Sequence, residues 1–123
     1  MSKFKILIID DEIQIRKLLE ITLVSEDYEV ILAENGMEGI RLVASKIPDL
    51  IMLDLGLPDI NGQLVLQQLR DWFSHPIMIL SVKNEESEIV KALDNGANDY
   101  LIKPFRTQEL LARVRSHMRN HIK

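Results

Sequence analysis

The sequence predicts one α/β domain built around a five-stranded parallel sheet. Five short apolar runs alternate with five segments that have the apolar spacing of amphipathic helices, and each right-handed crossover brings the next strand back parallel. A chain of 123 residues can bury a substantial core but leaves no room for a second domain. We therefore expect a three-layer sandwich whose functional groups gather at the carboxyl ends of the strands.

The expected strands are short apolar or β-branched runs bounded by polar or turn residues. The first, residues 4–9, runs into the acidic turn Asp10-Asp11-Glu12. The second, residues 28–33, is less uniformly apolar because of Glu29, which favours an outer position in the sheet. The remaining three are residues 50–54, residues 77–80 after Pro76, and residues 99–102 before Lys103-Pro104.

Between the strands, apolar residues recur at the spacing that places them on one face of a helix. We expect Asp10 or Asp11 to cap the first helix, Pro48 to stop the second and Gly96 to stop the fourth. The positions that define the five helices are Ile15, Leu18, Leu19, Thr22 and Leu23; Ile40, Val43, Ala44 and Ile47; Val65, Leu66, Leu69, Trp72 and Phe73; Ile89, Ala92 and Leu93 within residues 85–95; and Leu110, Leu111, Val114 and Met118.

The composition excludes several classes of function. A net charge of -4 makes the chain a poor nucleic-acid binder by itself. The absence of cysteine excludes disulfides, thiolate catalysis and cysteine-ligated metals. No apolar run approaches the ~20 residues that span a bilayer, and the N-terminal run lacks the features of a signal peptide. We expect a cytoplasmic protein with no membrane partner.

Asp54 ends the central apolar run, where a charge is costly unless a partner compensates it. The first, third, fourth and fifth predicted strands end on, or directly before, a charged residue or a serine. If the strand order is 2-1-3-4-5, these ends lie side by side, because neighbouring strands are ~4.8 Å apart. The groups are Asp10 and Asp11 after the first strand, Asp54 after the third, Ser81 after the fourth and Lys103 after the fifth.

This combination of groups fits phosphoryl transfer to a carboxylate. Three neighbouring carboxylates need a compensating cation, and oxygen ligands alone favour Mg²⁺, with Mn²⁺ also suitable. Asp54 could then attack a phosphoryl donor and form an aspartyl phosphate, with Lys103 and Ser81 holding the phosphoryl oxygens. Gly56 leaves the loop backbone open, so its carbonyl could also reach the cation. Taken singly, each residue has an ordinary structural explanation, such as a helix cap, a turn hydroxyl or a solvated lysine.

Together these residues resemble the receiver domains of two-component response regulators, which have a flavodoxin-like fold. The resemblance spans residues 1–123 and rests on Asp10-Asp11, on Asp54 with Pro58 and Gly62 downstream, on Ser81 and on Lys103-Pro104. It implies that Asp54 is the phosphoacceptor, that Asp11 binds Mg²⁺ directly and Asp10 in the outer shell, and that the Gly56 carbonyl is a further ligand. It also implies that Ser81 and Tyr100 are switch residues, that Lys103 binds phosphate, and that the bond to Pro104 is cis.

Within this family, residues 96–101 and 103–105 are similar to the winged-helix (OmpR/PhoB-like) transcription-factor branch. Residues 53–59 are most similar to its Kdp-type regulators. Receivers of this branch form homodimers through the fourth helix, fifth strand and fifth helix. The implied interface pairs Lys91 with Glu109, Asp94 with Arg115 and Asp99 with Arg113 around Val90, Leu93 and Ala112.

The sequence departs from the pattern of the branch at four points. Asn98 replaces the usual acid, and Asn120 stands where a basic residue is common. Val82 replaces a small residue next to the switch hydroxyl, which we expect to slow exchange at Asp54. The DNA-binding effector domain of the branch is absent, so the chain is expected to be either an excised fragment or a stand-alone receiver, which binds DNA only through such a domain.

The resemblance implies a signalling switch with at most self-phosphorylation and self-dephosphorylation activity, and not an enzyme for external substrates. A sensor histidine kinase would contact Ile15, Leu19 and the loop at Pro104-Phe105. A phosphatase of the haloacid dehalogenase type is an alternative, but it needs a second acid where Gly56 stands. A flavin- or nucleotide-binding domain is disfavoured by the acidic first loop, and a phosphate-independent protein-binding module is the fourth possibility.

Overall fold

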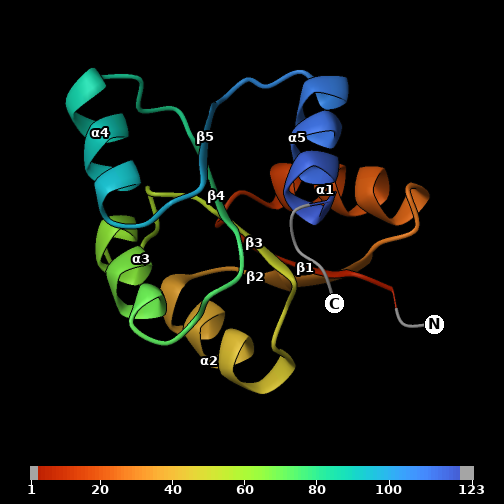
Figure 1. Cartoon of the computed structure of the whole chain (residues 1–123), viewed down its shortest axis with the longest axis horizontal. Helices are drawn as coiled ribbons and strands as arrows, with labels where there is room; N and C mark the ends of the chain where they lie inside the picture. The colour runs from red at the N-terminus through yellow and green to blue at the C-terminus, as the bar shows by residue number, and fades with distance from the viewer. Residues whose placement is uncertain (1–2, 120–123) are drawn as a thin grey trace.

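The computed structural model describes residues 3–119 and shows a parallel sheet between two layers of helices (Figure 1). The strand order is β2-β1-β3-β4-β5, which confirms the predicted order. The strands are β1 (Lys5–Ile9), β2 (Glu29–Ala33), β3 (Leu50–Leu53), β4 (Ile77–Ser81) and β5 (Asp99–Ile102), and all four pairings are parallel.

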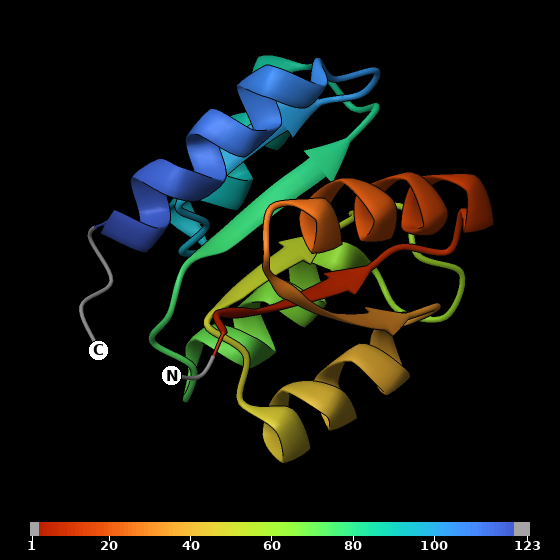
Figure 2. The same ribbon diagram turned by 90° about the vertical axis from the view of Figure 1, so that its right-hand side faces the viewer.

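The five helices divide between the two faces of the sheet, as the view in Figure 2 shows. Successive residues of a strand point to opposite faces of the sheet, so alternate side chains of each strand belong to the two halves of the core. The helices α1 (Ile13–Ser25) and α5 (Thr107–Arg119) pack on one face. The other face carries α2 (Gly36–Lys46), α3 (Gly62–Arg70) and α4 (Glu86–Asp94).

The central position of β3 explains why its sequence is an unbroken apolar run. All four of its residues are buried, since β1 and β4 flank it and helices cover both faces. By contrast β2 lies at an edge and is only partly buried, which confirms its predicted outer position. Asp54 follows β3 directly and is therefore held at the middle of the carboxyl edge of the sheet.

Two predictions about the helices are wrong in detail. Neither Asp10 nor Asp11 caps α1. The N-cap residue is Glu12, whose side chain forms no capping hydrogen bond. Asp10 Oδ1 instead accepts the Glu12 N–H at 2.9 Å within the turn. Helix α3 ends at Arg70, so Trp72 and Phe73 lie beyond it. Several apolar positions that follow helical spacing also face solvent: Leu18, Ala44, Ile47, Trp72 and Leu93.

The predicted stop of α2 before Pro48 is confirmed, since the helix ends at Lys46 and Ile47 is its C-cap. Ile47 adopts the left-handed conformation with φ of 50°, and its N–H donates to the Val43 carbonyl. The predicted stop at Gly96 is likewise confirmed, with φ of 108° just after α4. Within residues 3–119, no helix combines the length and apolar character that crossing a bilayer requires.

Candidate functional site

The backbone brings the polar residues that follow the strands to one edge of the sheet. The Asp54 N–H donates to the Ile9 carbonyl at 2.9 Å, and the Asp10 N–H donates to the Ala33 carbonyl at 3.1 Å. On the other side, the Lys103 N–H donates to the Ser81 carbonyl at 2.9 Å. These hydrogen bonds continue the parallel ladder past the strands, so the sheet itself sets the positions of the side chains.

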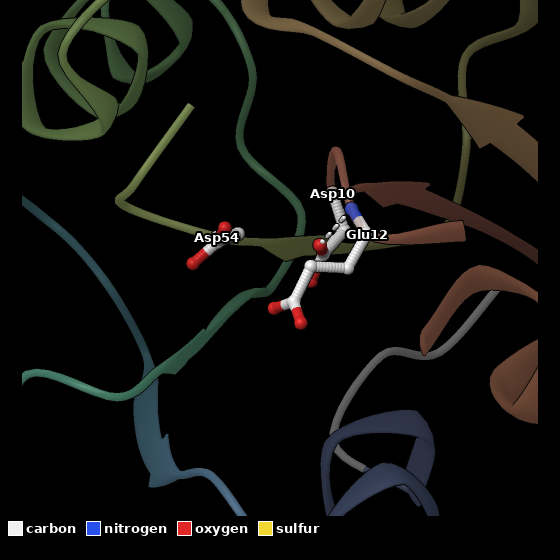
Figure 3. A group of neighbouring side chains, drawn as sticks. All are labelled: Asp10, Glu12 and Asp54. Carbon is white, nitrogen blue, oxygen red and sulfur yellow. Dashed lines mark hydrogen bonds between the residues drawn. The ribbon is translucent and has the colours of Figure 1, made fainter. Parts of the chain in front are cut away.

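Three carboxylates converge at this edge. Asp10, Glu12 and Asp54 each offer an oxygen, and these oxygens lie within 4.8 Å of one another (Figure 3). Asp10 and Asp54 are buried, whereas Glu12 is exposed. The donor set contains only oxygen, the kind of ligand that hard divalent cations prefer.

Glu12 is the member of this cluster that sequence reasoning missed. The turn after β1 explains its position, since the hydrogen bond between its N–H and Asp10 Oδ1 closes the turn around the site. The only signal in the sequence was its place as the third acid of Asp10-Asp11-Glu12. Asp11 is exposed and lines an open hollow beside the cluster. Its predicted role as a direct metal ligand stays a prediction.

Lys103 supplies the positive charge at the centre of the cluster. Its Nζ lies 2.8 Å from Asp10 Oδ2, 2.9 Å from Glu12 Oε1 and 3.8 Å from Asp54 Oδ1, and its side chain is buried. Burial lowers the pKa of Lys103, but the hydrogen bonds to Asp10 and Glu12 and the charge of Asp54 outweigh this and leave the pKa raised. The raised pKa keeps Lys103 protonated at neutral pH. The Lys103-Pro104 bond is cis, as the resemblance implied.

The Asp54 carboxyl is 7% exposed and has a raised pKa. Burial is the main cause, and the charges of Asp10 and Asp11 add to it. The ammonium of Lys103 and a hydrogen bond from the Gly56 backbone act in the opposite direction without cancelling it. The ionised form of Asp54 is thus incompletely compensated by the protein alone.

An open hollow of about 260 Å³ leads to Asp54. Its rim carries Val82, which is exposed, and Lys83. The residues that line it come from the ends of β1, β3, β4 and β5: Asp11, Glu12, Asp54, Gly56, Ser81, Val82, Lys83 and Lys103. The hollow therefore gives solvent and small solutes a direct route to the Asp54 carboxylate.

The two predicted switch residues both bind the backbone of Lys83. The Ser81 hydroxyl, which is buried, accepts the Lys83 N–H at 3.1 Å. The Tyr100 hydroxyl donates to the Lys83 carbonyl at 2.7 Å. Lys83 lies in the loop between β4 and α4, so both side chains are connected to the segment that leads into α4.

The loop between β3 and α3 is held at two points. Gly62 donates its N–H to the Leu55 carbonyl at 3.1 Å, and an added Cβ there would lie 2.4 Å from Leu55 Cα. Asp59 accepts the N–H groups of Gly36 and Met37, at the start of α2, at 2.8 and 2.9 Å. Gly56 precedes Asp59 and Gly62 in this loop, and an added Cβ there would lie 3.8 Å from Asp54 Oδ2, an ordinary van der Waals contact.

The residues predicted for a dimer interface lie on α4, β5 and α5. Val90 and Leu93 are 47% and 46% exposed. Asp99 Oδ1 accepts from Arg113 Nη1 at 2.9 Å within the chain, and Glu109 also binds Arg113. His117, which sequence reasoning missed, lies 3.0 Å from Asp99 Oδ2. Of the remaining interface residues, Lys91, Asp94, Ala112 and Arg115 are exposed. Asn120 lies outside the described residues.

The predicted kinase contact needs one correction. Leu19 is completely buried in the core between α1 and the sheet, and Ile15 packs against the same core, so Leu19 presents no surface to a partner. The phase of α1 instead exposes Ile13, Leu18 and Ile21. Because Leu18 and Leu19 are adjacent, the apolar spacing fits a helix that buries either one of them.

Comparisons with known proteins identify the family of this chain. The family model of the response regulator receiver domain matches residues 6–115. The transcriptional regulatory protein KdpE of Mycobacterium tuberculosis is 46% identical over 94% of this chain and 51% of its own length. The KDP operon transcriptional regulatory protein KdpE of Escherichia coli is 45% identical, over 94% of this chain and 52% of its own length. The chain thus spans about half the length of these curated relatives.

Solved structures with the same fold include two response regulators. The BeF3-activated N-terminal receiver domain of Klebsiella pneumoniae RstA has a TM-score of 0.90 and 30% identity, with 94% of this chain and 98% of that chain covered. A two-component response regulator from Clostridium difficile has a TM-score of 0.93 and 34% identity, with 95% and 97% covered. The two curated relatives above are named as transcriptional regulatory proteins, and the chain belongs to the response regulator receiver domains of two-component systems.

Proposed function

We propose that Asp54 accepts a phosphoryl group from a sensor histidine kinase and that its phosphorylation state controls homodimerisation. In the whole protein this switch would regulate transcription through an effector domain, as the names of the KdpE relatives suggest. The observation that carries the proposal is the Asp54 carboxylate itself, buried, facing an open hollow and 3.8 Å from the Lys103 ammonium.

The residues around Asp54 fit a Mg²⁺ ion. Asp10, Glu12 and Asp54 offer carboxylate oxygens within 4.8 Å of one another, and we place Asp11 and the Gly56 carbonyl as further ligands. When bound, the ion supplies positive charge that neutralises the carboxylates and a phosphoryl oxygen. The raised pKa of Asp54 supports this proposal, because the protein alone leaves its ionised form under-compensated. Mn²⁺ fits the same oxygen donors.

In the transfer step, an Asp54 oxygen attacks the phosphorus while the bond from phosphorus to the donor histidine nitrogen breaks. We propose that Lys103 Nζ, which lies 3.8 Å from Asp54 Oδ1 and contacts Asp10 and Glu12, holds a phosphoryl oxygen. The Ser81 hydroxyl, which is buried and lines the same hollow, would donate to a second oxygen. We also propose self-phosphorylation from small acyl phosphates and slow hydrolysis of the product.

The contacts of Lys83 support a route from the phosphoryl group to α4. Once Ser81 donates to a phosphoryl oxygen, its hydroxyl moves toward Asp54 and its hydrogen bond from the Lys83 N–H changes. Tyr100, bound to the Lys83 carbonyl, follows the same segment. Because α4 begins at Glu86, these changes shift the population of α4 positions without a new fold.

The exposed apolar residues Val90 and Leu93 support dimerisation through α4, β5 and α5. The intrachain pair of Asp99 and Arg113 would be exchanged, in the dimer, for a pair with Arg113 of the partner subunit. Exposed ion pairs contribute little individually, so this exchange would set the register of the dimer. For the kinase, we propose a contact with Ile13, Leu18 and the loop at Phe105.

The test uses beryllofluoride, the activating group of the related RstA receiver. Light scattering of the wild-type protein with Mg²⁺ should show a monomer that becomes a dimer when beryllofluoride is added. Asp54→Asn should stay monomeric under the same conditions, and Leu93→Asp should bind beryllofluoride without dimerising. A wild-type protein whose mass in solution is unchanged by beryllofluoride would contradict the proposed dimer.

A further inference from the structure

A buried glutamine connects the loop after Asp54 to α4. Gln63 is the second residue of α3 and is 4% exposed, an unusual position for a polar side chain. Its Nε2 donates to the Glu88 carbonyl in the first turn of α4 at 3.4 Å, and its Oε1 accepts from Asn95 Nδ2 at 2.9 Å. The side chain therefore contacts α4 near its beginning and at its C-cap.

The direction of these hydrogen bonds is fixed by the chemistry of the groups. A backbone carbonyl only accepts, so the amide nitrogen of Gln63 faces Glu88 and its oxygen faces Asn95. Asn95 Oδ1 in turn accepts from Gln67 Nε2 at 3.1 Å. The three amides thus form one polarised chain from α3 to α4, and breaking a link to Gln63 leaves that buried amide without one of its partners.

Apolar packing holds α4 only weakly. Ala92 is the one residue within α4 that is buried, and its side chain is a single methyl group. The amide chain is consequently a large part of what fixes this helix. The loop after α4 is attached separately, since Arg70 donates to the Gly96 carbonyl at 2.9 Å and also to Asn98 Oδ1, which accepts the Ile77 N–H at 2.9 Å.

At its other end, Gln63 is joined rigidly to the backbone of the phosphorylation site. It follows Gly62, whose Cα packs so closely on residues 54 and 55 that an added Cβ would lie 2.4 Å from Leu55 Cα and 2.9 Å from the Asp54 carbonyl oxygen. The Gly62 N–H also donates to the Leu55 carbonyl. A shift of the backbone at Asp54 would therefore displace the start of α3, to which Gln63 belongs.

We propose that Gln63 is a positioning residue that couples the backbone at Asp54 to the position of α4, in parallel with the contacts of Ser81 and Tyr100. This inference rests on the proposed function of Asp54 as phosphoacceptor. Hydrogen exchange of the α4 amides, residues 86–94, measures the coupling directly when it is followed with and without beryllofluoride and Mg²⁺.

The variant is Gln63→Met, which keeps the length and burial of the side chain and removes both hydrogen bonds. The matched control is Gln68→Met, the same change at an exposed position of the same helix. Without beryllofluoride, the α4 amides of Gln63→Met should exchange about threefold faster than wild type or more, while Gln68→Met stays within about twofold. Asn95→Ala should reproduce this effect, and the double variant should add little to it.

The change in α4 hydrogen exchange on adding beryllofluoride shows whether Gln63 couples Asp54 to α4 or only stabilises α4. In wild type and Gln68→Met, beryllofluoride should change exchange in α4, and in Gln63→Met this change should fall to less than half. Intact-mass measurement of phosphorylation should show that Gln63→Met still loads Asp54. A variant that responds as strongly as wild type contradicts the inference alone. A wild-type protein that does not respond contradicts the proposed function and the inference with it.

Discussion

Replacing Lys103 by Met should destabilise the protein by about 3 kcal/mol when no divalent cation is present, and Mg²⁺ should restore most of the loss. The Lys103 ammonium is buried and lies 2.8 Å from Asp10 Oδ2 and 2.9 Å from Glu12 Oε1. Removing one partner of a buried ion pair costs about 3 to 5 kcal/mol. We take the lower limit because Glu12 is exposed and can turn toward water.

The dependence on Mg²⁺ follows from the charges. With Lys103 ionised the cluster of Asp10, Glu12 and Asp54 has a net charge of about -2, and without it about -3. A divalent cation that binds only the folded state stabilises it by about 2.7 kcal/mol at 100 times its Kd. Because the variant site is more negative, the same Mg²⁺ concentration should stabilise Lys103→Met more than wild type.

The assay is urea unfolding followed by circular dichroism, in EDTA and in excess Mg²⁺. Lys17→Met is the matched control, since Lys17 is exposed on α1, and it should change stability by less than about 0.5 kcal/mol in both buffers. For the Lys103 variant, a loss below about 1 kcal/mol in EDTA, or a loss that Mg²⁺ leaves unchanged, would refute the reasoning.

Four further predictions follow from the same site. Asp54→Asn in EDTA should be more stable than wild type at neutral pH, and the gain should shrink as the pH falls toward 4. Folding raises the pKa of Asp54, so the ionised carboxylate destabilises wild type above this pKa and the protonated carboxyl does not below it. Urea unfolding at several pH values checks this. Gly62→Ala should cost about 1 to 3 kcal/mol, since its Cβ meets backbone atoms, whereas Gly56→Ala, whose Cβ would lie at an ordinary 3.8 Å from Asp54 Oδ2, should be nearly neutral in the same unfolding assay. Val82→Ala should speed both gain and loss of phosphate at Asp54 in mass-spectrometric time courses, and unchanged rates would reject the proposed crowding. Leu93→Asp should abolish dimerisation in light scattering while phosphorylation proceeds normally.

The sequence alone predicts the fold and the centre of the site for a simple physical reason. Parallel strands that alternate with helices end at one edge of the sheet, so residues such as Asp54, Ser81 and Lys103 are brought together by topology before any side-chain contact is known. The polar residues at the ends of the buried runs are therefore informative as a set, although each of them alone has an ordinary structural explanation.

Other features depend on geometry that a linear pattern does not contain. Leu19 is buried and Leu18 exposed because of a small difference in helix phase that the apolar spacing left open. Glu12 joins the acidic cluster through a local turn, where a cap had been expected. The contacts of Gln63 depend on how α3 and α4 are placed against each other, which the amphipathic pattern of either helix does not specify.

The most direct test of the central claim is a phosphorylation experiment on Asp54. The protein is incubated with Mg²⁺ and a small acyl phosphate donor, and the intact protein and its peptides are analysed by mass spectrometry beside Asp54→Asn. The account predicts one base-labile phosphoryl group on the wild-type peptide that contains Asp54 and none on the variant. A wild-type protein that gains no phosphoryl group, or a variant that keeps one, would contradict it.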